Sequence, residues 1–175
     1  MALVIASVAV DAHEELDSSL QRAKSASKAG AQLIEWRIDG LAGECDVPTA
    51  FDAVIRLIEQ APTACVVTCR PRAEGGEYDG DEADRVELLT RIIHADNPPR
   101  YVDVEFTTLQ DNPTFRRIAE EAAGEESETM NRASLIVSSH DMQRRPTRLL
   151  QTIESLTAEP ACRIIKLAWQ ARSLR

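Results

Sequence analysis

Lys166 and His140 are the two residues of this sequence best suited to covalent and proton-transfer chemistry. Lys166 lies in the apolar run CRIIKLAW, where loss of solvent and neighbouring positive charge would favour the neutral amine. A neutral amine can attack a ketone and form an imine. His140 ends the run SLIVSSH, and an imidazole readily changes its charge near neutral pH. Together they predict a Schiff-base reaction in which His140 moves a proton at the carbon next to the imine.

Three other charged residues fit the same site. A guanidinium binds a carboxylate bidentately, so Arg37 and Arg70 suit an anionic substrate, although either could instead pair with Glu35 or Asp39, Arg37 especially. Glu74, in the turn AEGGEYDG, could accept a hydrogen bond from His140 and fix its orientation. These residue types predict a pocket for a small anionic keto acid.

The elements that must position these residues alternate regularly. Short runs rich in Val and Ile, typical of parallel strands buried on both faces, alternate with amphipathic segments. The expected strands cover 3–8, 32–38, 64–70, 100–106, 134–139 and 162–167, and the expected helices cover 13–29, 48–60, 81–95, 112–123 and 145–157. This pattern predicts an α/β fold, either a doubly wound open sheet or a (β/α)8 barrel. The first turn has no GxGxxG motif, which disfavours dinucleotide binding.

The candidate residues gather at the carboxyl ends of the expected strands, the edge where β/α barrels place their active sites. Side chains alternate along a strand with a period of two residues. Residues that share a face are therefore Glu35 with Arg37, Thr68 with Arg70, Ser138 with His140, and Ile164 with Lys166. Each polar side chain is expected above apolar ones on one face of the sheet.

Composition limits the classes of partner and compartment. A net charge of −9 over 175 residues argues against nucleic acid and anionic membranes as partners. The apolar start MALVIASVAV lacks basic residues and is too short to span a bilayer, so we expect a first strand and a cytoplasmic protein. Cys65 and Cys69 are expected to be buried free thiols, His13 and His94 surface residues, and 124–128 a solvated acidic loop.

Five motifs resemble a known family in their order and spacing. They are EWRID at 35–39, VTCRPRAEGG at 67–76, YVDVEF at 101–106, VSSHD at 137–141 and IIKLA at 164–168. From the first strand to the end of the chain, the sequence resembles type I 3-dehydroquinate dehydratase. The resemblance implies a (β/α)8 barrel, usually a homodimer, that works without a metal or an organic cofactor. It also implies conversion of 3-dehydroquinate to 3-dehydroshikimate by syn elimination of water, a step of the shikimate pathway.

The resemblance assigns a role to each matching residue. It implies that Lys166 is the Schiff-base lysine, His140 the general acid and base, and Glu74 the residue that orients His140. The substrate-binding residues that it implies are Glu35, Arg37, Arg70 and, near the end of the first strand, Ser7.

The number of expected strands is smaller than a barrel requires, since a (β/α)8 barrel has eight strands and typically about 250 residues. We therefore expect residues 1–175 to form one incomplete barrel domain, with about six β/α units, of a longer protein. The family also uses an arginine on strand seven and a serine and glutamine after strand eight, and these positions have no counterpart here. Two other functions remain open: a class I Schiff-base aldolase, and an inactive fragment or binding module that exposes apolar strand edges.

Overall fold

Six parallel strands form one sheet in the order of the sequence. The computed structural model describes residues 3–124 and 133–171. The strands are β1 (Ile5–Ala9), β2 (Leu33–Arg37), β3 (Cys65–Thr68), β4 (Tyr101–Glu105), β5 (Ser134–Asp141) and β6 (Cys162–Trp169). Each predicted strand is confirmed. The last two run on to Asp141 and Trp169, because their ends continue to pair with each other in register.

The helices between the strands follow the predicted amphipathic segments. In the described residues they are α1 (Leu16–Lys28), α2 (Asp39–Glu44), α3 (Val47–Glu59), α4 (Glu82–Ile93), α5 (Phe106–Asp111), α6 (Pro113–Gly124) and α7 (Leu149–Thr157), with a 3-10 turn η1 (Arg72–Glu74). The starts of α3 and α4 are capped by Asp46 and Asp81, whose carboxylates accept backbone N–H bonds. The short helices α2 and α5 were not predicted, because six residues are too few to show a helical period.

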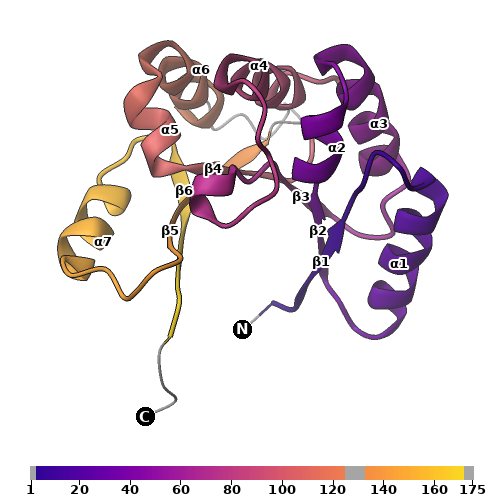
Figure 1. Ribbon diagram of the computed structural model, residues 1–175, viewed down its shortest axis with the longest axis horizontal. Helices are drawn as coiled ribbons and strands as arrows, with labels where there is room; N and C mark the ends of the chain where they lie inside the picture. The colour runs from indigo at the N-terminus through magenta and orange to yellow at the C-terminus, as the bar shows by residue number, and fades with distance from the viewer. Residues whose placement is uncertain (1–2, 125–132, 172–175) are drawn as a thin grey trace.

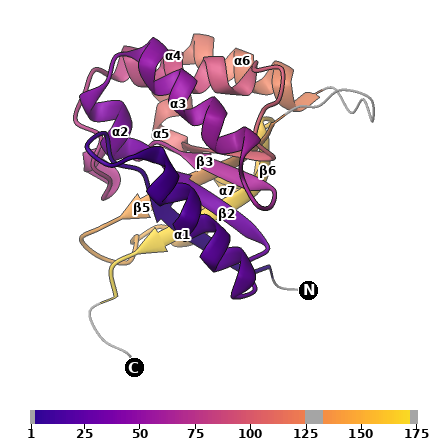
Figure 2. The same ribbon diagram turned by 90° about the vertical axis from the view of Figure 1, so that its right-hand side faces the viewer.

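The longer helices lie around the outer side of the curved sheet. Figure 1 shows α1, α3, α4, α6 and α7 following one another around it, and Figure 2 shows the same arrangement from the side. Each internal strand has two neighbours, whereas β1 and β6 have one each. The described chain is therefore an α/β structure with an open parallel sheet, covered by helices on its outer face.

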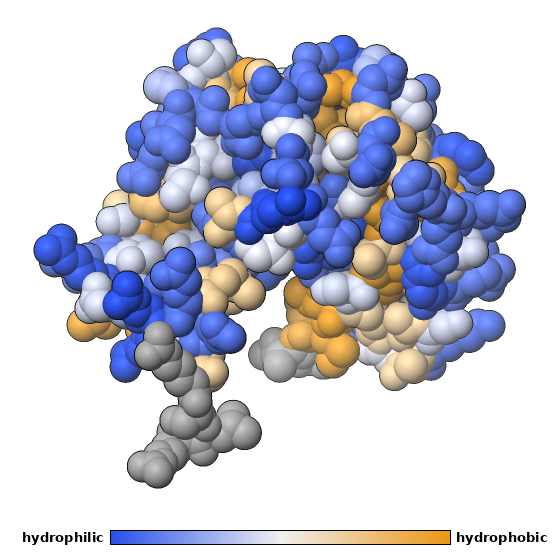
Figure 3. Space-filling model, in the orientation of Figure 1, coloured by the Kyte–Doolittle hydropathy of each residue, from blue (hydrophilic) through white to orange (hydrophobic). Residues whose placement is uncertain are grey.

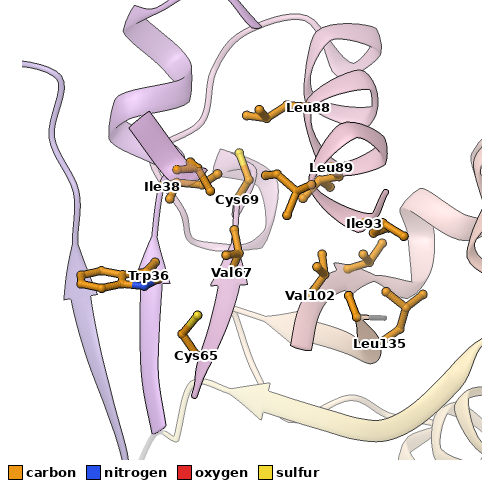
Figure 4. Packing of buried hydrophobic residues seen from close by; sticks show 14 of the residues in the cluster. Trp36, Ile38, Cys65, Val67, Cys69, Leu88, Leu89, Ile93, Val102 and Leu135 are labelled. Atoms are coloured by element: carbon orange, nitrogen blue, oxygen red, sulfur yellow. The ribbon is translucent and has the colours of Figure 1, made fainter. Parts of the chain in front are cut away.

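The two faces of the sheet carry different side chains, as the period of two predicts. Trp36, Val67, Val102 and Leu135 lie in one buried apolar cluster together with Leu89 of α4 (Figure 4). On the opposite, inner face, polar side chains lie above apolar ones. The buried apolar side chains of that lower layer are Leu33, Val66 and Ile136. The outer face thus anchors the helices and leaves the inner face for the polar residues.

The two edge strands expose apolar side chains. Ile5 of β1 is 48% exposed, and Ile164, Ile165 and Trp169 of β6 are 39–40% exposed. Figure 3 shows hydrophobic surface at the lower edge of the molecule. An unpaired strand edge also leaves backbone groups available for pairing, so this exposure agrees with the expectation of apolar edges.

The remaining sequence expectations concern the surface. His13 and His94 are exposed, as predicted. Most of the acidic segment at 124–128 falls in 125–132, outside the described residues. No helix in the part of the chain that the structure describes is long and apolar enough to cross a membrane.

Candidate active site

Lys166 lies on the inner face of the sheet between two carboxylates. Its Nζ donates hydrogen bonds to Asp103 Oδ2 at 2.8 Å and to Glu35 Oε1 at 3.0 Å. These three residues come from β6, β4 and β2, so the curvature of the sheet brings together strands that are not neighbours. The expectation of positive charge around Lys166 was wrong about its direct partners, because alternation along a strand gives the face of a side chain but not its partner across the sheet. The expected loss of solvent was wrong as well, because the Lys166 side chain is 38% exposed and therefore partly accessible.

Glu35 binds the lysine and two hydroxyl groups. Its carboxylate accepts hydrogen bonds from Ser7 and, at 2.9 Å, from Thr68 Oγ1. Burial raises the pKa of Glu35, but Lys166, Ser7 and Thr68 together lower it more, so its pKa lies below the usual value. Glu35 is therefore an anion at neutral pH. Ser7, predicted to face the substrate, lies next to this anion on β1.

Arg70 and Asp103 continue the charged site into the interior. Arg70 Nη2 lies 2.8 Å from Asp103 Oδ1, and Nη1 lies 2.5 Å from Glu105 Oε1 and 2.8 Å from Ser138 Oγ. Burial raises the pKa of Asp103, whereas Arg70 and Lys166 lower it more strongly together, so its pKa is lowered overall. Nη2 is close to Asp103 but aligned with no hydrogen-bond acceptor among the described residues. Arg70, predicted to bind a substrate carboxylate, is only 3% exposed and is ion-paired with the buried carboxylates of Asp103 and Glu105.

Arg85, which the sequence reasoning missed, holds the inner end of this network. It projects from α4, is 1% exposed, and lies 2.7 Å from Glu105 Oε2 and 2.8 Å from the Cys69 carbonyl oxygen. It also binds Glu82 and Thr108. A signal was present in the sequence: Arg85 precedes Leu88, Leu89 and Ile92 by three, four and seven residues, the spacing of one buried helix face. A buried arginine at such a position needs a carboxylate, which Glu105 supplies.

His140 and Glu74 form the predicted pair. His140 Nδ1 lies 3.0 Å from Glu74 Oε2, and the backbone N–H of His140 donates to the same oxygen at 2.9 Å. The pair joins the end of β5 to the turn η1, and both side chains are nearly buried. Ser138 pairs in register with Lys166, so His140, two residues further along β5, faces the same side as the lysine.

Arg37 forms an ion pair with Asp39, one of the two partners that the sequence analysis left open. Its Nε and Nη2 donate to the two carboxylate oxygens of Asp39 at 2.9 and 2.8 Å. The hydrogen bonds to Asp39 raise the pKa of Arg37, against a smaller effect of burial. The Arg37 side chain is 30% exposed at the end of β2. Asp39 therefore fixes the orientation of Arg37 while part of the side chain stays accessible.

This arrangement suits covalent chemistry on a small anion. A lysine amine, an imidazole–carboxylate pair and two arginines lie at one end of the inner face, together with ionised Glu35 and Asp103. An amine can form an imine with a carbonyl group, and an imidazole can exchange protons with the adjacent carbon. Within residues 3–124 and 133–171, no group of three or more His, Cys, Asp or Glu side chains is arranged to hold a metal ion.

Comparison with known proteins links this site to one family. The sequence model of type I 3-dehydroquinase matches residues 6–175. The 3-dehydroquinate dehydratase of Methanosarcina barkeri is 34% identical over 161 residues, which are 91% of this chain and 63% of that protein. This chain therefore spans less than two thirds of that relative's length.

Solved structures share the fold at low sequence identity. The type I 3-dehydroquinate dehydratase of Clostridium difficile, solved with covalently modified comenic acid, aligns with a TM-score of 0.73 at 16% identity, over 98% of this chain and 64% of that one. The 3-dehydroquinate dehydratase of Geobacillus kaustophilus aligns with a TM-score of 0.71 at 21% identity, over 99% of this chain and 63% of that one. The described α/β sheet therefore has the fold of the corresponding part of these proteins.

Proposed function

The chain belongs to the type I 3-dehydroquinase family, and on that premise we propose that the whole protein dehydrates 3-dehydroquinate to 3-dehydroshikimate through a lysine Schiff base. The observation that carries this proposal is the position of Lys166, an accessible amine on the same face as His140 and next to two carboxylates. Residues 1–175 would contribute one domain, with the lysine, the imidazole and the substrate-binding residues.

In the proposed binding step, Arg37 and Arg70 attract the substrate carboxylate, and Glu35 accepts hydrogen bonds from its hydroxyl groups. The part of the Arg37 side chain that remains exposed supports this assignment. Ser7, which already donates to Glu35, would complete the polar contacts. Two cations above a layer of Leu33, Val66 and Ile136 favour a small anion with an apolar ring face.

In the proposed covalent step, neutral Lys166 attacks the ketone carbon, and loss of one water gives the imine. Asp103 and Glu35 would stabilise the positively charged imine once it forms, because both carboxylates lie within hydrogen-bond distance of the nitrogen that carries the charge. The covalently modified comenic acid of the Clostridium difficile structure supports a family site capable of covalent chemistry.

In the proposed elimination, His140 removes a proton from the carbon next to the imine and gives an enamine. The enamine expels the hydroxyl group, which takes the proton from His140 and leaves as water. Hydrolysis of the imine then releases the product and restores the amine. Glu74 supports this role because it binds Nδ1 of His140, which leaves Nε2 for the substrate.

Borohydride trapping tests the proposal. The protein would be mixed with 3-dehydroquinate, reduced, digested and mapped by peptide mass spectrometry. The chain has three lysines, and Lys24 and Lys28 lie exposed on α1, so they report non-specific reduction in the same sample. We expect one adduct, on Lys166. An adduct spread over all three lysines, or full dehydratase activity of Lys166→Ala in the whole protein, would contradict the Schiff-base mechanism.

A second substrate class separates this function from an aldolase. The whole protein would be given 3-dehydroquinate and, separately, small aldol substrates, with His140→Ala alongside. We expect dehydration without aldol cleavage, and a His140→Ala variant that still forms the imine but dehydrates slowly.

We further propose that the whole protein is cytoplasmic and forms a homodimer. Sizing by light scattering would test the homodimer.

A further inference from the structure

We propose that Thr107 is a positioning residue that holds the Glu74 carboxylate and, through it, sets the tautomer of His140. The inference rests on the proposed function, in which His140 moves the protons. Thr107 Oγ1 donates a hydrogen bond to Glu74 Oε1 at 3.0 Å, while Oε2 accepts the backbone N–H of His140 at 2.9 Å and lies 3.0 Å from its Nδ1. Both oxygens of one carboxylate are therefore engaged, one by α5 and the other by β5.

The backbone beneath Glu74 is held firmly, but its side chain is not fixed by the turn alone. The N–H groups of Glu74 and Gly76 both donate to the Pro71 carbonyl oxygen, at 3.0 and 3.1 Å. Gly75 has a positive φ of 80° and packs against Met142, just beyond the end of β5. The terminal torsion of a glutamate is broad, so only contacts to both oxygens fix the plane of the carboxylate. Thr107 supplies the contact on the side away from His140.

The position of Thr107 is itself set by the buried charges. Thr107 is the second residue of α5, which begins directly after Glu105. Glu105 is fully buried and binds Arg70 and Arg85, so the start of α5 is anchored to the sheet and to α4. The Thr107 side chain is exposed, and its hydroxyl group has no part in that buried network. Its replacement should therefore change the Glu74 contact without removing a structural ion pair.

The consequence for His140 follows from the chemistry of imidazole. A neutral imidazole has one N–H and one lone pair, and the hydrogen bond made by one nitrogen decides which nitrogen carries the proton. A fixed carboxylate at Nδ1 selects the Nδ1–H form and leaves the Nε2 lone pair to accept a substrate proton. A carboxylate free to rotate into solvent would hold Nδ1–H for only part of the time, and both tautomers would then be populated.

Imidazole nitrogen NMR on the chain without substrate tests this proposal at a pH where His140 is neutral. The chain has three histidines, and His13 and His94 are exposed internal references. We expect the wild-type chain and Thr107→Ser to show His140 as Nδ1–H, and Thr107→Val to show a mixture of tautomers. The matched control is Thr152→Val, which removes a hydroxyl group of α7 that donates to the carbonyl oxygen of Arg148, the residue before that helix. It should leave His140 unchanged.

Kinetics of the whole protein supply the second measurement. Loss of one positioning hydrogen bond should lower kcat of Thr107→Val about threefold to tenfold, with KM unchanged and activity restored in Thr107→Ser. The proposal would be overturned if His140 kept its wild-type tautomer in Thr107→Val. It would also be overturned if Thr107→Ser behaved like Thr107→Val. The NMR measurement needs no substrate. A protein without dehydratase activity would therefore remove the proposed function and leave the tautomer result standing.

Discussion

Lys166 Nζ lies 2.8 Å from Asp103 Oδ2, and the other oxygen of the same carboxylate lies 2.8 Å from Arg70 Nη2. One fully buried carboxylate from β4 is thus shared by the candidate nucleophile and a buried arginine. Arg70 also binds Glu105, which binds Arg85 of α4. Positive and negative side chains therefore alternate from Lys166 to the buried face of α4. Asp103 therefore contacts both the candidate nucleophile and the buried ion pairs of the sheet.

The lowered pKa of Glu35 gives stability a defined pH dependence. A carboxyl group whose pKa is lowered by folding stabilises the fold above its unfolded value of about 4.3, and this contribution is lost as the pH falls towards the folded pKa. We expect Glu35→Gln to lower the free energy of unfolding by about 1–3 kcal/mol at pH 7. Urea denaturation should show the difference from wild type shrinking below about pH 4. A difference constant down to pH 3 would contradict this assignment, and the exposed Glu59→Gln serves as the control.

Removal of Arg85 should be strongly destabilising. Arg85→Met leaves Glu105 buried with one cation fewer, and breaking a buried ion pair costs about 3–5 kcal/mol. Arg91→Met, on the same helix, removes an exposed pair with Glu87 and should cost less than about 1 kcal/mol. Urea denaturation of both variants measures the contrast. Equal losses in the two variants would show that the buried network adds no special stability.

Gly76 allows the turn that carries Glu74 to pass close to Arg70, just after β3. A Cβ atom at this position would lie 2.0 Å from the Arg70 carbonyl oxygen, so Gly76→Ala must displace the backbone. We expect a loss of about 1–3 kcal/mol or more and a weaker Glu74–His140 contact. Gly43→Ala is the matched control, because nothing lies within 4 Å of its added Cβ in helix α2. Thermal unfolding should place the control at or above wild type, and a well-folded Gly76→Ala chain with the same Tm would refute the prediction.

Burial should protect two of the four cysteines from thiol reagents. Burial raises the pKa of Cys65 to about 11 and also raises the pKa of Cys69, so little reactive thiolate forms at pH 8. Cys45 and Cys162 are only partly buried, although burial raises the pKa of Cys162 as well, so Cys45 should react fastest. Timed labelling with a disulfide reagent, followed by mass mapping, should modify Cys45 and Cys162 first and the other two only in urea. Equal rates at all four positions in the folded chain would contradict the buried assignment.

Much of the fold was predictable because its signals are local. Continuous Val and Ile runs identified all six strands, and the period of two placed Glu35, Thr68 and Ser138 on one face with apolar residues below them. The short helices α2 and α5 left no such signal, since six residues complete fewer than two helical turns.

The candidate site, like the fold, was predictable only in part. The sequence by itself identified candidate residues for the chemistry, and it predicted the contact between Glu74 and His140 from residue type. Only the tertiary structure decided that Lys166 lies between Asp103 and Glu35 rather than among cations, and that Arg70 is buried in ion pairs. The physical reason is that strand alternation is set by each residue's own backbone, whereas contacts across a curved sheet depend on the packing of all its strands and helices.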